Sequence, residues 1–384
     1  ENCVIISVAD TGVGMTQEQL ESLKEGLKER RSAKVGIGLG NIYKRIHILY
    51  EKGEMNIWSR RGCGTVVQTG IALEQVDETE TVTKKADEEK TGRKGAGIMT
   101  KQEFQKLTEN LLFLDGATGS NLMAAGMPRG ICTEAWIMEH KEVLQNLQKA
   151  YVEAGSQIVY APTFGGNRYS LGLHGLQDKL AEMNHALVNI SREAVGHKVY
   201  VAGDITTTGK MMEPAGDLTY EMAYETYCEQ IKVLEDAGVD LIAAETMINI
   251  EETLAALDAA ASVSSLPVMC TMTVEADGSI FSGGNAVEAA IALEGAGAVA
   301  VGINCSVGPD QLVSVVRNIK ENVSIPVIAK PNAGMPTIDD QGNAIYSMDA
   351  KSFAEHMKVL IENGASVVGG CCGTTPEFIR EISR

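Results

Sequence analysis

The residues best suited to chemistry in this sequence are three of its eight cysteines. Cys305 stands in GINCS, and Cys371 and Cys372 are adjacent in GGCCG, each time after a short apolar run. Three thiolates around one point select zinc, and three protein ligands leave the fourth tetrahedral position open, as in catalytic zinc sites. Such a zinc is a poor activator of water but can bind an incoming thiol and keep it deprotonated. The trio therefore indicates a thiol-alkylating enzyme rather than a hydrolase.

Two plainer interpretations of the trio stay open at this point. The three residues could be ordinary buried cysteines, or Cys371 and Cys372 could form a redox pair, since adjacent cysteines are not a standard zinc-finger spacing. The other five cysteines lie outside the trio, and we expect them to be packing residues: Cys3, Cys63, Cys132, Cys228 and Cys270.

An alternation of helix-like and strand-like segments would bring the trio to one surface. Four helix-like segments end in a glycine and lead into a β-branched apolar run, which is the junction typical of a parallel sheet: Gly155, Gly238, Gly297 and Gly364. Eight such runs occur in total, at 111–115, 157–161, 199–204, 239–244, 267–273, 298–303, 326–330 and 365–370. Eight βα units predict an α/β fold with a (β/α)8 TIM-like barrel. A doubly wound open sheet is the alternative, but its G-x-G-x-x-G turn is missing after the first run.

In a barrel of this kind, reactive side chains gather at the C-terminal ends of the strands. Cys305 follows the sixth strand, and Cys371 and Cys372 follow the eighth, so the three sulfurs can meet across the barrel mouth. The histidines at 174 and 185 lie on helix-like segments away from this rim, and we expect them to be surface or packing residues. The other rim candidates are Asp115, Asp204, Thr206, Glu245, Asn304 and Asn332.

Motifs along the whole barrel resemble the homocysteine S-methyltransferase family, and most of all the homocysteine-binding module of cobalamin-dependent methionine synthase. The resemblance covers residues 99–384 and is most specific in its last segments. The matching segments are FLDGATGSNL, YAPTFGGNRYSLGLHGL, VAGDITTTGKMMEP, AAETM, VGINCSVGP, KPNAGMP and GGCCGTTPEFI.

The resemblance implies a zinc-dependent methyltransferase that converts homocysteine to methionine, with Cys305, Cys371 and Cys372 as metal ligands. It also implies that Asp115 and Gly116 hold the amino-acid end of homocysteine, and that Glu245 accepts a hydrogen bond from the substrate ammonium. A zwitterionic substrate needs an anion for its ammonium and N–H groups for its carboxylate. No catalytic residue is expected beyond the zinc site.

The methyl donor is expected to be methylcobalamin, supplied by a separate corrinoid carrier protein or domain. Short connections after strands five, six and eight, and no long aromatic-rich insertion, favour an open rim that admits so large a donor. The alternative is a homocysteine methyltransferase that uses S-methylmethionine or betaine directly.

Residues 1–75 carry three glycine-rich boxes, DTGVGM at 10–15, GIGLGN at 36–41 and GCGT at 62–65. In this order they resemble the second half of the ATP-binding domain of sensor histidine kinases, a partial α/β sandwich. The asparagine box and the phosphoacceptor histidine of that family would lie upstream of Glu1. We therefore expect no functional cofactor site here, and the alternative of another class is a non-catalytic kinase output fragment.

The composition changes sharply between these two parts. Residues 76–98 are rich in charges of both signs and lack aromatic residues, which predicts a linker between 1–75 and a barrel at 99–384. Lys94-Gly95-Ala96 can be encoded by a purine run typical of a bacterial ribosome-binding site, so Met99 is a candidate native start. A true fusion with an ordinary linker is the alternative.

Charge and hydropathy exclude several classes of partner. Lysine and arginine total 33 against 51 acidic residues, a formal net charge of −18, which disfavours nucleic acid and anionic membranes. No apolar run reaches the length of a membrane span and no secretion signal opens the chain. We therefore expect a cytoplasmic protein whose cysteines are reduced.

Overall fold

The computed structural model describes residues 3–28, 39, 42, 43, 46, 47, 53–62, 64–72, 99–338 and 344–384. The chain divides into two units, residues 1–97 with 211–221, and residues 98–210 with 222–384. The predicted linker at 76–98 lies outside the described residues, as do Cys63 and most of the second glycine-rich box.

The smaller unit contains a three-stranded antiparallel sheet of order β1-β3-β2, formed by β1 (Cys3–Ala9), β2 (Glu54–Arg60) and β3 (Gly64–Ala72). Helix α1 (Gln17–Lys28) buries three leucines of one face together with Ile57 of β2. The first and third glycine-rich boxes meet, because the Asp10 N–H donates to the Thr65 carbonyl at 2.9 Å. This is an α/β arrangement, and the kinase resemblance stays a prediction.

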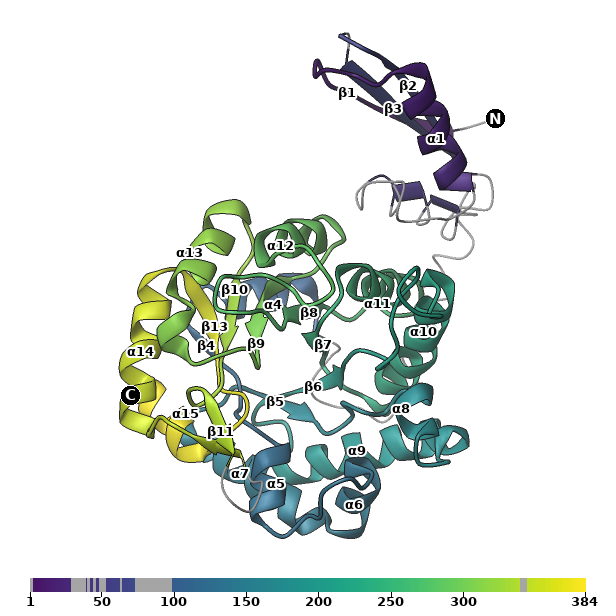
Figure 1. Ribbon diagram of the computed structural model, residues 1–384. Coiled ribbons are helices and arrows are strands. Elements are labelled where there is room, and N and C mark those ends of the chain that lie inside the picture. The colour runs from purple at the N-terminus through teal and green to yellow at the C-terminus, as the bar shows by residue number, and fades with distance from the viewer. Residues whose placement is uncertain are drawn as a thin grey trace. The chain divides into compact units, whose positions relative to one another are not determined.

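The larger unit is an eight-stranded parallel sheet that curls into a barrel (Figure 1). Its strand order is β4-β13-β10-β9-β8-β7-β6-β5, and each strand overlaps one of the eight predicted runs. The (β/α)8 prediction is confirmed and the open-sheet alternative is wrong. The strands are β4 (Leu112–Phe113), β5 (Ile158–Ala161), β6 (Tyr200–Ile205), β7 (Leu241–Met247), β8 (Val268–Met272), β9 (Ala300–Asn304), β10 (Val327–Lys330) and β13 (Ala365–Val368).

The first two strands meet at a seam that is closed by fewer main-chain hydrogen bonds than the rest of the barrel. The Gln157 N–H donates to the Phe113 carbonyl at 2.8 Å. Beyond that point a side chain takes over, since Asp115 Oδ2 accepts from the Tyr160 N–H at 2.8 Å. One of the predicted site residues therefore also closes the barrel.

Helices cover the outside of the barrel (Figure 1). Their apolar faces follow the helical period, as in α14, which buries Phe353, Met357 and Leu360. The four predicted cap glycines all have positive φ, between 88° and 113°. The helices are α5 (Gly119–Ala124), α6 (Thr133–Glu139), α7 (Lys141–Ala154), α8 (Arg168–Gly172), α9 (Leu180–Val195), α10 (Tyr220–Ala237), α11 (Ile250–Val263), α12 (Ala286–Gly295), α13 (Val313–Asn322), α14 (Ala350–Glu362) and α15 (Pro376–Ile382).

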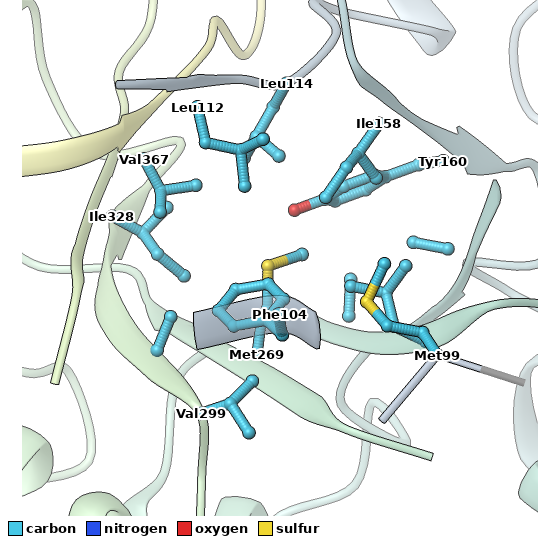
Figure 2. Close-up of a cluster of buried hydrophobic side chains, with 14 residues drawn as sticks. Met99, Phe104, Leu112, Leu114, Ile158, Tyr160, Met269, Val299, Ile328 and Val367 are labelled. Atoms are coloured by element: carbon cyan, nitrogen blue, oxygen red, sulfur yellow. The ribbon is translucent and has the colours of Figure 1, made fainter. Parts of the chain in front are cut away.

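A further helix, α4 (Lys101–Leu107), precedes the first strand and closes the N-terminal end of the barrel. Its Phe104 is fully buried, and Met99 just before it is 2% exposed. Figure 2 shows both side chains among residues from the beginnings of several strands, including Leu112 and Ile158. The bottom of the barrel is therefore a packed apolar core, and any reactive site must lie at the opposite mouth.

One rim connection differs from the expectation of a short loop, and another contains additional strands. The connection after the fifth strand, residues 273–285, is long and carries Phe281, whose side chain is 81% exposed. The connection after the seventh strand contains a hairpin of β11 (Pro336–Ile338) and β12 (Ala344–Tyr346). The expectation of a short connection after strand five is therefore wrong. Among the described residues, no helix is long and apolar enough to cross a bilayer.

Candidate metal centre

The three predicted cysteines come together at the C-terminal mouth of the barrel. The Sγ atoms of Cys305, Cys371 and Cys372 all lie within 4.8 Å of one another, and the Cys305 and Cys372 sulfurs are 3.5 Å apart. Zinc–sulfur bonds of about 2.3 Å in tetrahedral geometry place two ligand sulfurs about 3.8 Å apart. The trio therefore fits zinc in both donor type and spacing.

The electrostatics of the trio also suit a cation. Hydrogen bonds from the Cys305 and Cys371 thiols lower the pKa of Cys372 to about 3, whereas the bonds that Cys371 makes with the other two sulfurs raise its own pKa. The other two thiols thus favour the deprotonated form of Cys372. A zinc ion would replace the shared protons and bind three thiolates.

Cys305 is held in an unusual backbone conformation. Its φ is 53°, in the left-handed region that few non-glycine residues adopt, so the surrounding contacts must impose it. The Cys305 N–H donates to the Lys330 carbonyl at 3.2 Å, and Asn332 Nδ2 donates to the Cys305 carbonyl at 3.1 Å. The sulfur is therefore aimed by hydrogen bonds from the neighbouring strand and its loop.

The loop that carries Cys371 and Cys372 is tied to the loop after the first strand. Thr374 Oγ1 donates to the Cys371 carbonyl at 2.7 Å and accepts from the Ala117 N–H at 3.1 Å. Asn121 Nδ2 bonds both the Ala117 and the Thr374 carbonyls, at 2.7 and 2.8 Å. These bonds fix two of the three sulfurs relative to the predicted Asp115-Gly116 pair.

An aromatic residue that the sequence analysis missed lies against this loop. Tyr346 of β12 forms a hydrogen bond with the Cys372 side chain, and its ring packs on Gly373. A Cβ at Gly373 would come within 2.3 Å of that ring, and φ there is +82°, so glycine is required. No local pattern reveals Tyr346, because it reaches the site from a separate hairpin.

Glu245 lies at the same mouth and is 8% exposed. Its Oε2 accepts from Lys330 Nζ at 3.0 Å, and no hydrogen bond to its Oε1 exists among the described residues. Asn304 Nδ2 lies 3.5 Å from Glu245 Oε2 and 3.8 Å from Cys371 Sγ. The carboxylate and the sulfur trio are therefore close neighbours.

A β-bulge places Glu245 in this position. The register of β7 against β8 shifts between Ala244 and Met247, and Thr246 has a φ of 58°. The fully buried Asn304 holds the bulge, because its Oδ1 accepts from the Thr246 N–H at 2.8 Å and its Nδ2 donates to the Thr246 hydroxyl at 2.8 Å. Bulges of this kind redirect side chains beside active sites. Asn304 is thus an organising residue of the mouth.

Asp115 is more deeply buried than a simple rim acid, at 1% exposed. Besides its bond across the seam, its Oδ1 lies 3.5 Å from Lys330 Nζ. Burial raises the pKa of Asp115 to about 6, against the opposing effects of Lys330 and the Tyr160 amide. Next to it, a Cβ at Gly116 would come within 2.6 Å of the Tyr151 hydroxyl, so only glycine fits.

Lys330 is the second residue that the sequence analysis missed. Burial lowers the pKa of this ammonium, but Glu245 and Asp115 outweigh that effect and raise it well above its usual value. One signal could have revealed it, since a lysine that ends an otherwise apolar barrel strand is rarely buried unless it is paired.

The remaining rim candidates surround the same centre. Burial, reinforced by the charge of Glu245, raises the pKa of Asp204, and its Oδ1 has no hydrogen-bond partner among the described residues. The Thr206 hydroxyl donates to the Glu245 carbonyl at 2.8 Å. Asn332 also bonds the Ser306 carbonyl at 3.1 Å.

The histidines and cysteines that we did not assign to the metal centre lie outside it wherever the structure describes them. His174 is exposed, and His185 of α9 pairs with Asp236 at 3.1 Å. Cys132 and Cys270 are buried as free thiols, and Cys228 is partly buried on α10. The side chains of Cys3 and Cys63 are outside the described part of the chain.

Comparisons with known proteins find relatives of the barrel. A family model described as homocysteine S-methyltransferase matches residues 112–384. Methionine synthases from Mycobacterium leprae (strain TN) and Mycobacterium tuberculosis (strain ATCC 25618 / H37Rv) are each 31% identical, over 73% and 72% of this chain. The chain spans about a quarter of the length of these relatives, 24% and 25%.

Solved structures show the same fold. The metallated form of the homocysteine methyltransferase MmuM from Escherichia coli has a TM-score of 0.62 at 20% identity and covers 74% of this chain and 99% of its own. The oxidized form of the same protein gives 0.60 at 21% identity, with 71% and 95% covered.

Proposed function

The chain belongs to the homocysteine S-methyltransferase family, and from this premise we propose that its barrel is a zinc-dependent methyltransferase that converts homocysteine to methionine. We assign this activity to residues 99–384 and no activity to the glycine-rich boxes of residues 1–75. The observation that carries the proposal is the sulfur trio beside a carboxylate with one free oxygen, all at one barrel mouth.

Cys305, Cys371 and Cys372 would hold the zinc ion. Bound there, zinc would supply a fourth coordination position for a sulfur and lower the pKa of the incoming thiol. The chain's own part is to keep its three sulfurs converged, through the hydrogen bonds to Cys305 and the Thr374 contacts. A deprotonated thiol placed in line with an activated methyl group needs no acid–base residue for the transfer itself.

The other end of homocysteine would be bound by the carboxylate rim. Glu245 Oε1 is the acceptor we assign to the substrate ammonium, since Oε2 is already bonded to Lys330. The Gly116 N–H, which makes no hydrogen bond among the described residues, is the donor we assign to the substrate carboxylate. Asp115 would support both by closing the seam and by contacting Lys330.

For the methyl donor we propose methylcobalamin, carried by a corrinoid protein or domain. The support is the resemblance to the homocysteine-binding module of cobalamin-dependent methionine synthase, together with the 31% identity to two methionine synthases. The longer connection at 273–285 weakens the argument from an open rim. The donor therefore requires a direct test.

The test supplies the zinc-loaded full chain with homocysteine and each donor in parallel, and measures methionine. We expect slow methionine formation from free methylcobalamin and faster formation from a methylated corrinoid protein. The matched background is Cys305→Ala in every arm. Rapid turnover with betaine or S-methylmethionine, and none with methylcobalamin, would identify the alternative donor. If none of the donors yields methionine, the proposed activity is contradicted.

A further inference from the structure

Lys330 is the one lysine of the barrel mouth, among the described residues, whose ammonium is enclosed by protein, at 3% exposed. Its Nζ lies 3.0 Å from Glu245 Oε2, 3.5 Å from Asp115 Oδ1 and 4.0 Å from the centroid of the Tyr160 ring. An ammonium needs such partners to remain buried, because desolvation otherwise excludes the charged form.

The contacts of Glu245 show what this lysine does. The carboxylate is bonded on one side only, with Oε2 held by Lys330 and Oε1 without a donor among the described residues. A carboxylate held by one oxygen has a fixed direction for the other. The direction of the free oxygen, Oε1, is therefore set by the bond between Lys330 and Oε2.

The main chain of Lys330 contacts the other end of the site. Its carbonyl accepts from the Cys305 N–H at 3.2 Å, and Cys305 has the left-handed φ that aims its sulfur. A single residue thus bonds a metal-ligand cysteine through its backbone and the acid of the rim through its side chain. It fixes the distance between the sulfur end and the acid end.

The charged groups around Lys330 suit the binding of a substrate ammonium. Three buried carboxylates, Asp115, Asp204 and Glu245, lie around this one buried ammonium, so acidic groups are in excess at the mouth and favour a cationic group of the substrate. Without Lys330, the two buried acids that contact it would repel each other, and Glu245 Oε2 would keep only the longer contact of 3.5 Å from Asn304 Nδ2.

We propose that Lys330 is a positioning residue that fixes Glu245 for the α-ammonium of the substrate and so makes the site selective for amino-acid thiols. The proposal rests on the proposed function, since it takes the substrate to be homocysteine.

The experiment measures binding of homocysteine and of 4-mercaptobutyrate, which has the same thiol and carboxylate but no amine. Calorimetry is carried out on the zinc-loaded full chain, as wild type, Lys330→Met, Glu245→Gln, the double variant, and Lys358→Met, which removes an exposed lysine of α14. Zinc content is determined for every protein.

We expect Glu245→Gln and Lys330→Met each to weaken homocysteine binding by about ten- to a hundredfold, the range of a charge-assisted hydrogen bond. Binding of 4-mercaptobutyrate and zinc content should stay at the wild-type level. The double variant should bind homocysteine no more weakly than the single variant with the lower affinity, because Lys330 acts through Glu245. Lys358→Met should match wild type.

Unchanged homocysteine binding in Lys330→Met would overturn the inference. Equal loss of both thiols, or loss of zinc, would also overturn it, since it would show a merely structural role. If Lys330→Met does not fold, the double variant, which removes both charges, decides: homocysteine binding weaker than in Glu245→Gln contradicts the coupling. Failure of the wild type to bind homocysteine would instead contradict the proposed function.

Discussion

At the scale of single residues, the centre depends on backbone positions as much as on side chains. Cys305 and Thr246 both have positive φ, at 53° and 58°, and they are the non-glycine residues with this conformation among those described. Each is held by hydrogen bonds from a neighbouring strand end. Strained positions of this kind persist only where surrounding contacts impose them, and they gather at functional sites.

The three cysteines should behave as one unit. Cys305→Ala, Cys371→Ala and Cys372→Ala each leave two thiolates, so we expect every variant to purify with far less than one zinc per chain and to lose homocysteine turnover. Cys270→Ala is the control, because this buried thiol of β8 lies outside the trio. Metal analysis of the purified proteins checks this, and full zinc occupancy in any of the three would remove that residue from the site.

At the scale of elements, the two ends of the barrel have separate tasks. The N-terminal end is filled by α4 and by apolar residues from the beginnings of the strands (Figure 2). The C-terminal end carries the buried charges, the sulfurs and the hairpin with Tyr346. Stability and reactivity are thus supplied by opposite ends of the same strands.

Phe104 of α4 should contribute to stability without affecting the site. It is fully buried, so Phe104→Ala removes a large apolar side chain and leaves a cavity, which costs about 3–5 kcal/mol in the free energy of unfolding. Phe281→Ala is the matched control, since that ring is 81% exposed and should change stability by less than about 0.5 kcal/mol. Urea unfolding of both variants measures the difference, and equal stabilities would show that α4 does not close the core.

At the scale of the whole molecule, the barrel begins with a defined element. Thr100 and Glu103 form a capping box, in which the Thr100 hydroxyl accepts from the Glu103 N–H and the Glu103 carboxylate accepts from the Thr100 N–H. Met99, directly before this cap, is a core residue. Met99, which the sequence predicts as a candidate start, is therefore packed in the core, and it is the first residue of the barrel that the structure describes.

A chain that begins at Met99 should fold and bind zinc as well as the full chain. It retains the capping box, Phe104 and every strand of the barrel. A chain that begins at Leu107 loses Met99 and Phe104, and we expect it to melt at a markedly lower temperature. Thermal unfolding and zinc content of the three proteins check this. A large loss of stability in the Met99 chain would show that earlier residues belong to the fold.

The barrel and the convergence of the three sulfurs could be predicted from the amino-acid sequence. Eight apolar runs, each after a helical segment, define βα units whatever their exact contacts, because the period of side chains along the chain is a local property. Cys305 and the Cys371-Cys372 pair stand directly after two of these runs, and strand ends of one parallel barrel share one mouth. The trio could therefore be placed without coordinates.

The contacts of the acids could not be predicted in this way, because they depend on the three-dimensional fold. Glu245 was identified at its strand end, but which of its oxygens is free depends on Lys330, which lies 85 positions further along the chain. Likewise, the approach of Tyr346 to Cys372 depends on a hairpin from another connection, and the seam role of Asp115 depends on the meeting of the first two strands. A hydrogen bond between distant residues is set by barrel closure and strand register, and neither leaves a pattern in the sequence around either partner.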